Sequence, residues 1–312
     1  MSIFELISHD TGLSLPYITK LARKAPHSYK HYTIPKRTGG TRDIYHPIPE
    51  LKVIQHWLAN HIFQVLPVHA CVYSYRRGIN VAQHAAAHLR SHFLLRLDIK
   101  DFFPSITSKD ISNLLKKNLK IIPVDLDPAD IKTICRIVCR ATNDSAKLRL
   151  TIGAPSSPVI SNAILYELDE IMFRHCEKNK VTYTRYADDL YFSTCSPNIL
   201  SGIEGFVRSE LKSCKSPKLK INPDKTVFTS KKRKRIVTGI TITSSDKISI
   251  GRDAKRHIRT EIYLHFSGRL SSEQLSTLRG RLCYYRSVEP EFINALSKKY
   301  GEERIFSLIK GE

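Results

Sequence analysis

The chain lacks a long apolar run, a signal peptide, internal repeats and low-complexity linkers. No stretch of eighteen residues is wholly apolar, which argues against a membrane-spanning helix. The N-terminal segment MSIFELISHDTGLSLPY is too polar for a signal peptide, so a cytoplasmic location is expected. We therefore expect one integrated body with subregions, since 312 residues are enough to bury a real core.

A second pair of closely spaced cysteines is also missing. Only Cys135 and Cys139, of seven cysteines, lie close together in sequence. Their CxxxC spacing on a helical pattern has no partner pair that could complete a zinc site. We therefore expect buried free thiols in a reducing compartment.

Acidic residues are too few to balance the basic ones. The chain has 50 Lys and Arg against 29 Asp and Glu, for a net charge of +21 and a pI near 9.7. Such an excess points to a polyanionic partner, and to nucleic acid before an acidic membrane surface. Residues 212–235 alone hold ten Lys and Arg against one acid, with KKRKR at 231–235. A phosphate-tracking surface fits this run, while a solvated loop or a nuclear-import signal is the alternative.

Apolar periodicity predicts an α+β layout, with a sheet covered by helices on one face. Helices are expected at both ends and in four inner segments: 1–25, 51–66, 110–142, 153–179 after a Gly/Pro loop, 201–213, and from 253 onward. Strands are expected in a basic hairpin turning at Gly39 and Gly40, at 92–99, in a hairpin at 181–194, and as a pair at 234–243.

Two adjacent aspartates interrupt the strand-forming segment TRYADDLYFST, residues 184–194. Strands disfavour Asp, so Asp188 and Asp189 at the predicted hairpin tip conflict with the local structure. Asp98 ends another apolar strand in LLRLDIKDFFPSI. Three carboxylates gathered by one sheet would repel one another unless divalent cations neutralise them, and oxygen-only ligands suit Mg²⁺. Two such ions about 3.5–4 Å apart can promote an in-line phosphoryl displacement.

Five segments occur in an order typical of a known family: LDIKDFFPSI, GAPSSP, YADDL, INPDKT and VTGI. Together they resemble the palm motifs of reverse transcriptases, and most closely those of the bacterial retron reverse transcriptases. The resemblance implies a right-hand polymerase fold with a palm of antiparallel sheet covered by helices. It implies fingers and an N-terminal helical region at 1–96, a palm at 97–245 with a helical insertion at about 108–150, and a helical thumb at 246–312. No sequence is left over for a ribonuclease H domain.

The resemblance also assigns catalytic roles. Asp98 and Asp188 become direct metal ligands, Asp189 the third catalytic acid, and Ile99 a ligand through its backbone carbonyl only. Two Mg²⁺ ions and deoxynucleoside triphosphates are the implied cofactor and substrates. Lys225 matches a lysine proposed to protonate the leaving pyrophosphate, with a structural or phosphate-binding role as the alternative.

The nucleotide pocket is assigned in the same way. Cations on the basic hairpin would bind the triphosphate, the candidates being Lys36, Arg37 and Arg42. Phe103 falls where the family keeps an aromatic gate against a 2′-hydroxyl; a core position is the alternative, and Phe102 could share either role. The GAPSSP loop would shape the pocket through Gly153, Ala154, Pro155 and Ser156. Capping of the following helix by Ser156 or Ser157 is compatible with that role.

Two further segments distinguish retron enzymes within the family. The VTG triplet is matched by Val237, Thr238 and Gly239, and is assigned to nucleic acid. An NAxxH element is matched either by HAAAH, ending at His88 with His84 where asparagine is expected, or by NVAQH starting at Asn80. His88 is also assigned to nucleic acid, and a histidine on a helix surface is the alternative for both His84 and His88.

Basic residues and tyrosines alternate in the terminal helices. The cations assigned to nucleic acid are Arg252, Lys255, Arg256, Arg259 and Arg279, with Arg281 and Arg286 beside Tyr284 and Tyr285. Such a surface suits a thumb that grips a duplex backbone and stacks on an exposed loop base, and core packing is the alternative for the tyrosines.

The retron resemblance implies a particular product and partners. The enzyme would bind its own structured noncoding RNA, prime from the 2′-hydroxyl of an internal guanosine, and leave branched RNA–DNA (msDNA). It would act in anti-phage defence with an effector protein encoded nearby. A group II intron or diversity-generating reverse transcriptase, and a noncatalytic RNA-binding scaffold, are the alternatives.

Overall fold

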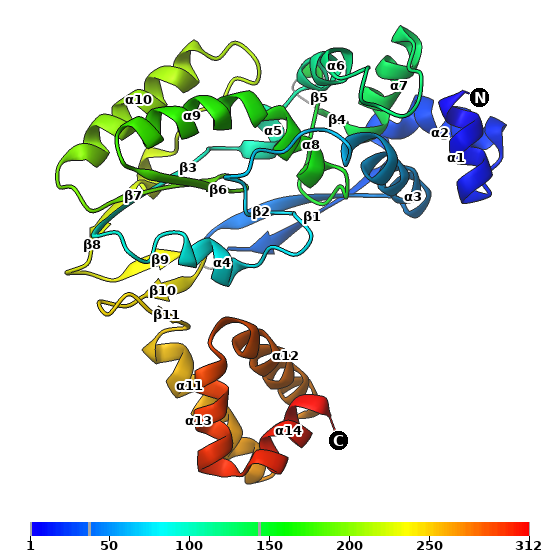
Figure 1. Ribbon diagram of the computed structural model, residues 1–312. Coiled ribbons are helices and arrows are strands. Elements are labelled where there is room, and N and C mark those ends of the chain that lie inside the picture. Colours follow the sequence, from blue (N-terminus) through cyan, green and yellow to red (C-terminus); the bar gives the residue numbers. More distant parts are fainter. Residues whose placement is uncertain (1, 37–38, 143–144, 312) are drawn as a thin grey trace.

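The computed structural model describes residues 2–36, 39–142 and 145–311. Its N-terminal part begins with two helices and a basic hairpin (Figure 1). Their bounds are α1 (Ile3–Thr11), α2 (Leu15–Lys24), a 3₁₀ turn (Ala25–His27), β1 (Tyr29–Pro35), β2 (Thr41–Pro47), and α3 (Pro49–Leu58), which continues as a π-helical turn (Ala59–Phe63). Gly39 and Gly40 have φ angles of 88° and 77°, values that glycine adopts without a steric penalty, so the predicted hairpin turn is confirmed.

A four-stranded antiparallel sheet forms the centre of the molecule, in the order β6-β7-β3-β8. The strands are β3 (Phe93–Asp98), β6 (Thr182–Tyr186), β7 (Asp189–Thr194) and β8 (Val227–Ser230). One face is covered by α9 (Tyr166–Lys178) and α10 (Ile199–Ser213), as Figure 1 shows. The predicted α+β layout, with helices over one face of the sheet, is therefore confirmed.

Two predicted helical segments are interrupted. The segment 110–142 contains α6 (Ser108–Lys117), α7 (Pro128–Val138) and strand β4 (Arg140–Thr142), which pairs with β5 (Ser145–Arg149). A new helix starts at α7 because Asp127 caps it in a capping box with Asp130, and Pro128 occupies its first turn. The segment 153–179 contains two helices, α8 (Ser157–Ile164) and α9, which are separated at Leu165. A short helix that was not predicted, α5 (Phe102–Ser105), follows β3.

The other face of the sheet carries a smaller layer that leads into the C-terminal helices. This layer consists of α4 (Val81–Ala86), a 3₁₀ turn (Pro223–Lys225), β9 (Arg235–Val237), β10 (Ile240–Ile242) and β11 (Ile248–Ser249). After β11 come α11 (Arg252–Phe266), α12 (Ser272–Val288), α13 (Pro290–Tyr300) and α14 (Glu302–Lys310), which form the helical group at the bottom of Figure 1.

Strand alternation divides the buried residues between two cores. Leu95 and Phe192 face α9 and α10 in a core that extends through the N-terminal part of the chain. Leu94 and Tyr191 point the other way, into a core shared with Val237 and the C-terminal helices. Successive side chains of a strand point to opposite faces, so this second face also carries Arg96, Asp98 and Asp189.

The cysteines are free throughout the described residues. Cys71, Cys135, Cys139 and Cys176 are buried, and burial raises the pKa of each thiol, as expected for inert core cysteines. The prediction of buried thiols is wrong for three others, since Cys195 and Cys283 are exposed and Cys214 is half-buried. None of the described helices combines the length and apolar character that a bilayer crossing requires.

Candidate active site

The register of β3 and β7 brings the strand-end acids together. Asp98 lies opposite Asp189 in the antiparallel ladder, and the Ile99 N–H donates to the Asp188 carbonyl at 2.8 Å. Between β6 and β7 the chain turns through Ala187, whose φ is 55° and whose N–H donates to Ser74 Oγ at 2.8 Å. The tip is therefore shorter than predicted, since it contains Ala187 and Asp188 while Asp189 is the first residue of β7.

A fully buried ion pair between Arg185 and Asp169 supports this tip. Arg185 donates from Nε and Nη2 to the Asp169 carboxylate at 2.8 and 2.6 Å, and both side chains are wholly inaccessible to solvent. Its Nη1 reaches Asn162 Oδ1 at 3.2 Å and the Ala187 carbonyl at 3.4 Å. The Tyr183 hydroxyl donates to the same carboxylate at 2.8 Å. A planar guanidinium with five donors can hold helix α9, α8 and the hairpin tip at once, which lysine could not do.

A cavity of about 620 Å³ opens beside the tip. Its walls come from β2, the β3–α5 segment, the β4–β5 hairpin, the hairpin tip and the 3₁₀ turn. The charged side chains in the lining are Asp43, Asp98, Asp101, Asp188, Lys36, Arg42, Lys100, Arg140, Arg149 and Lys225. Six of these side chains are cationic and four are acidic, and Asp98 and Asp188 are the two acids at the strand ends. This balance of charge suits a ligand that carries several negative charges together with bound cations.

The carboxylates of Asp98 and Asp188 are positioned to bind a cation. Asp98 is 3% exposed and already accepts hydrogen bonds from Lys225 Nζ at 2.8 and 3.1 Å. Burial raises the pKa of Asp188, and the nearby Asp98 charge raises it further. Both groups offer only oxygen ligands, which hard divalent cations prefer, and a bound cation would offset their repulsion. The donor set and its charge therefore fit a divalent metal held by Asp98 and Asp188.

Asp189 is held differently from the other two acids. Its carboxylate accepts two parallel hydrogen bonds from Arg96, at 2.9 Å from Nε and 3.0 Å from Nη2, and it does not line the cavity. Burial raises its pKa to about 6, although the Arg96 charge opposes the shift. Among the described residues no group of three acids is placed to hold a metal ion, although Asp98, Asp188 and Asp189 all lie at the same strand ends. Its role as third catalytic acid stays a prediction.

The family model described as reverse transcriptase (RNA-dependent DNA polymerase) matches residues 34–242. The chain belongs to the reverse transcriptase family. Retron Ec83 reverse transcriptase of Escherichia coli is 38% identical over 93% of this chain and 92% of its own length. Retron Ec73 reverse transcriptase, from the same species, is 32% identical over 97% and 96%.

Solved structures give the same fold at low identity. Apo telomerase of Candida tropicalis superposes with a TM-score of 0.51 at 14% identity, over 95% of this chain and 64% of that chain. A Candida albicans telomerase structure has a TM-score of 0.50 at 13% identity, over 90% and 59%. This reverse transcriptase thus spans less than two thirds of those telomerase chains. The predicted right-hand polymerase fold and RNA-directed DNA polymerase activity are confirmed.

Several predicted nucleotide-binding residues of the reverse transcriptase line the cavity. Lys36 and Arg42 extend into it from the fingers hairpin, while Arg37 lies outside the described residues. Phe102 and Phe103 both reach the lining, but Phe102 is 5% exposed and belongs to the core, so Phe103 is the more accessible ring. The gate role of Phe103 remains a prediction.

Sequence reasoning missed three cations of this pocket: Lys100, Arg140 and Arg149. Arg140 packs over the Tyr45 ring with its guanidinium carbon 3.5 Å from the centroid, and Arg149 Nη1 donates to the Pro104 carbonyl at 2.6 Å. Arg140 and Arg149 lie on the β4–β5 hairpin, of which only β4 falls within the segment 110–142 that was predicted as helix. Recognition of RATNDSAKLR as two short strands would have pointed to them.

The GAPSSP loop serves a packing role that was not predicted. Gly153, Ala154, Pro155 and Ser156 are absent from the cavity lining, whereas the preceding Thr151 and Ile152 are part of it. A Cβ on Gly153 would lie 2.8 Å from the Tyr45 carbonyl oxygen, so glycine is required because β2 passes close by. Ser156 occupies the N-cap position of α8 but makes no side-chain capping hydrogen bond.

Gly153→Ala is expected to lower the free energy of unfolding by about 2–3 kcal/mol, because φ is 108° and the new methyl would meet β2. Urea denaturation measures the change. Gly205→Ala is the matched control: Gly205 lies within helix α10 with open space around its Cβ position, so alanine should stabilise by about 0.5–1 kcal/mol. Equal effects at the two sites would contradict this account of Gly153.

The two histidines of the retron-type segments are buried, so the helix-surface alternative is wrong. His84 and His88 are 0% and 1% exposed. His84 Nε2 and His88 Nε2 both lie 2.7 Å from Thr184 Oγ1 on β6, and His88 Nδ1 lies 2.7 Å from Ser193 Oγ on β7. Both side chains contact the β6–β7 hairpin, and neither is exposed to solvent. His88 was predicted to contact nucleic acid, but it is buried inside the protein.

The NVAQH register explains the position of His84. Asn80 caps α4 in a capping box with Gln83, and His84 in the next turn meets Thr238 Oγ1 at 3.2 Å through Nδ1. The Thr238 N–H donates to the Tyr191 hydroxyl at 3.1 Å. The asparagine is therefore a helix start signal. Within the VTG triplet Val237 is fully buried, so only Thr238 and Gly239 can meet a ligand.

We expect the reverse transcriptase to lose stability in mild acid through His88. Burial lowers the pKa of His88 to about 3 and that of His84 to about 4. Between pH 6.5 and 5 the unfolded chain binds a proton at His88 that the folded protein does not, so stability falls as pH falls, by about 2 kcal/mol for this residue. Urea denaturation at a series of pH values measures the slope. His88→Gln, which cannot titrate, should have the shallower slope, and identical slopes would contradict the assignment.

Some predicted nucleic-acid cations instead hold the thumb helices together. Lys255 pairs with Glu289, and Arg279 Nε donates to the Leu308 carbonyl at 3.1 Å in the last turn of α14. Arg252, Arg256 and Arg259 are exposed on α11. In the basic run, Arg235 is 1% exposed and bonded to Thr243 and Asp246, so this cation of KKRKR is structural.

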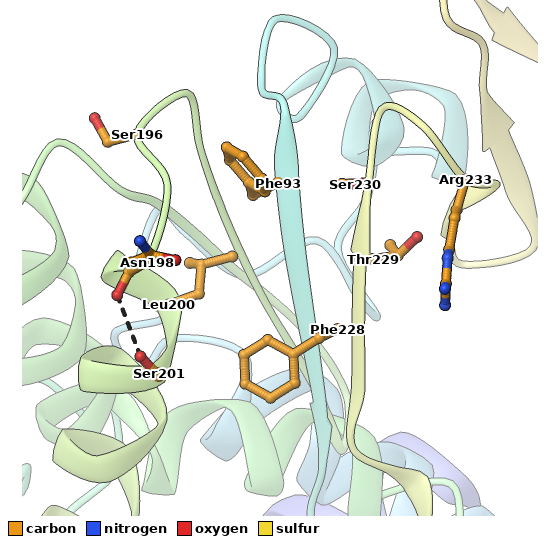
Figure 2. A pocket seen from close by; sticks show the side chains of 9 residues that line it. All are labelled: Phe93, Ser196, Asn198, Leu200, Ser201, Phe228, Thr229, Ser230 and Arg233. Atoms are coloured by element: carbon orange, nitrogen blue, oxygen red, sulfur yellow. Dashed lines mark hydrogen bonds between the residues drawn. The ribbon is translucent and has the colours of Figure 1, made fainter.

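A further cavity, of about 340 Å³, lies at the opposite end of β3 (Figure 2). Phe93 and Phe228 project from neighbouring strands towards Leu200 at the start of α10. Asp98 ends the strand that Phe93 begins, and no acid lines this cavity. None of the predicted catalytic or nucleotide-binding residues lines it.

Proposed function

We propose that this reverse transcriptase copies a structured noncoding RNA of the retron type, with Mg²⁺ as its metal and priming from a 2′-hydroxyl of that RNA. The observation that carries the proposal is the joint occurrence of the Asp98–Asp188 site with the VTG turn packed on the NVAQH helix. Similarity to two retron reverse transcriptases over more than nine tenths of the chain supports it. The division into fingers (1–96), palm (97–245) and thumb (246–312) belongs to the same proposal.

The residues of the cavity have distinct tasks in this reaction. Asp98 and Asp188 would hold two Mg²⁺ ions, with the Ile99 carbonyl as a further ligand and Asp189 as the third acid. When bound, the metal supplies charge neutralisation for phosphoryl transfer and activates the attacking hydroxyl. Lys36 and Arg42 would bind the triphosphate oxygens. Lys225, which donates hydrogen bonds to Asp98, would give its proton to the departing pyrophosphate.

The biological setting follows from the same assignment. We infer that synthesis starts at an internal guanosine and stops within the template, so the product is a branched RNA–DNA molecule, msDNA. The enzyme and its product would restrain an effector protein in anti-phage defence, in the cytoplasm of a bacterium. The basic surface, with a net charge of +21, supports the RNA partner, since phosphate contacts dominate such binding.

Sequencing of the nucleic acid that copurifies with the protein tests this function. The proposal expects RNA joined to DNA through a 2′–5′ bond, which a debranching enzyme separates into two molecules. Intron RNA or a variable-repeat template would indicate one of the other reverse transcriptase groups. RNA with no attached DNA would indicate a scaffold, and either result would overturn the proposal.

A further inference from the structure

A strip of the palm sheet lies open beside the strand-end acids. Residues directly opposite each other in an antiparallel ladder point to the same face, so Arg96 on β3 shares a row with Tyr191 on β7 and Val227 on β8. The Arg96 side chain is 39% exposed and Val227 is 46% exposed. Leu94, two residues earlier on β3, is 3% exposed because the second core covers it. The open strip therefore consists of the Arg96 row, between the acids and the covered part of the face.

The guanidinium of Arg96 uses only one of its edges within the protein. Nε and Nη2 donate to the Asp189 carboxylate at 2.9 and 3.0 Å, and the guanidinium carbon lies 6.0 Å from the centre of the Tyr191 ring. Within the described residues Nη1 has no hydrogen-bond partner, and it is not buried. A guanidinium has five N–H donors in a planar fork, so its Nη1–Nη2 edge is open to a second anion.

The bonds to Asp189 also fix the orientation of that open edge. A side chain that is already held in one geometry loses little conformational entropy when it binds a ligand. An ammonium group in the same place could neutralise Asp189, but it would lack the second planar edge, since lysine is a point charge on a flexible stem. The use of arginine here is thus explained if two anions are bound at once.

The strip leads from the metal site to the VTG turn. The Thr238 N–H donates to the Tyr191 hydroxyl at 3.1 Å, so the turn lies beside the row that contains Arg96. At the other side, Arg96 precedes Asp98 by two residues, which is about 6.6 Å along a strand. The 5′-phosphate and the 3′-hydroxyl of one nucleotide are separated by a similar distance. A strand whose 3′-hydroxyl reaches Asp98 can therefore place its last phosphodiester at Arg96.

We propose that Arg96 binds the last phosphodiester of the growing DNA strand through its Nη1–Nη2 edge, while its Nε–Nη2 edge holds Asp189. The side chain thereby positions the strand end and this acid relative to each other, and its charge offsets the repulsion between the phosphate and the acids. The inference rests on the proposed metal site at Asp98 and Asp188. It adds a contact to the product strand, whereas Lys36 and Arg42 are assigned to the incoming triphosphate.

Removal of one phosphate charge from a defined primer tests the contact. The probe is a fluorescent DNA primer annealed to an RNA template, with either a normal last phosphodiester or an uncharged methylphosphonate there. Anisotropy in the presence of EDTA measures binding to the full chain without any contribution from a metal. The wild-type protein should bind the methylphosphonate primer about tenfold more weakly. Arg96→Met should bind both primers equally, and as weakly as the wild type binds the methylphosphonate primer. Equal binding of both primers by the wild type, or an unchanged ratio in Arg96→Met, would overturn the proposal.

Further variants guard against a change in folding. Arg96→Met leaves the Asp189 carboxylate without its partner, so the double variant Arg96→Met with Asp189→Asn removes both charges and must also fail to discriminate between the primers. Asp189→Asn alone keeps the guanidinium and should still discriminate. A methylphosphonate placed far upstream should weaken binding by the same factor in the wild type and in Arg96→Met. A double variant that discriminates as the wild type does would contradict the role of Arg96.

Extension of oligo(dT) on poly(rA) with Mg²⁺ reports the metal site separately. A wild-type protein that extends this primer but binds both anisotropy probes equally would disprove the Arg96 contact alone. A protein that discriminates between the probes but does not extend the primer would uphold the contact and count against the proposed metal site.

Discussion

Asp98→Asn and Asp188→Asn should each abolish cDNA synthesis, with a loss of at least about a thousandfold, or ~4 kcal/mol in the activation barrier. Both carboxylates line the cavity, and removal of one charge weakens a pair of oxygen ligands that suits a divalent cation. Asp189→Asn is expected to be inactive as well, because its carboxylate, held by Arg96, contributes negative charge at the same strand ends. Primer extension with labelled nucleotides measures the loss.

RNA binding and folding should persist in these variants. The isosteric amide leaves the backbone of the β6–β7 hairpin intact, so melting temperature and RNA affinity should stay near wild type. Asp125→Asn, which removes an exposed carboxylate from a loop far from the cavity, is the matched control and should extend a primer normally. Extension at near wild-type rate by either Asp98→Asn or Asp188→Asn would show that the metal assignment is wrong.

Arg185→Met should lower the free energy of unfolding by about 3–5 kcal/mol. The substitution leaves the Asp169 carboxylate buried without its guanidinium partner, and an unpaired buried charge is among the most destabilising changes available. It also removes the contacts to Asn162 and the Ala187 carbonyl, so the tip that carries Asp188 loses its support. Urea denaturation gives the stability, and primer extension should fall in the fraction that remains folded.

A double substitution separates the charge from the packing. Arg185→Met combined with Asp169→Leu removes both charges, so much of the lost stability should return, while extension stays impaired because the Ala187 carbonyl still lacks its donor. If the double variant were as unstable as the single one, the loss would arise from packing and not from an isolated carboxylate.

The sequence predicted the hairpin with its acids because that information is local. Strand periodicity around TRYADDLYFST and the ordered motifs were enough to place Asp98 and Asp188 at one end of a sheet. The long-range pairings were out of reach: Asp169 lies sixteen residues before Arg185 on a separate helix, and no pattern within either segment indicates their contact. The same holds for Arg96, whose pairing with Asp189 depends on the register of two strands far apart in sequence.

Gly153 and His88 show how a motif can be recognised while its physical role is not. Glycine before Ala-Pro suggested a backbone that lies close to a ligand, but the close neighbour is the Tyr45 carbonyl of a strand more than a hundred residues earlier. His88 was assigned to nucleic acid, yet it lies in the interior among Thr184 and Ser193. In both cases the role depends on a residue that is distant in sequence and close in the fold. The residues around a motif do not reveal which distant residue that is.

The contact between Lys225 and Asp98 separates metal dependence from folding. The ammonium group acts as a counter-ion for a carboxylate that is 3% exposed, so the chain itself compensates the charge of this buried acid. A chelator should therefore stop DNA synthesis without lowering the melting temperature. On the proposed assignment, a metal held by Asp98 would share this carboxylate with the lysine or displace the lysine, so folding of the protein would not depend on the metal.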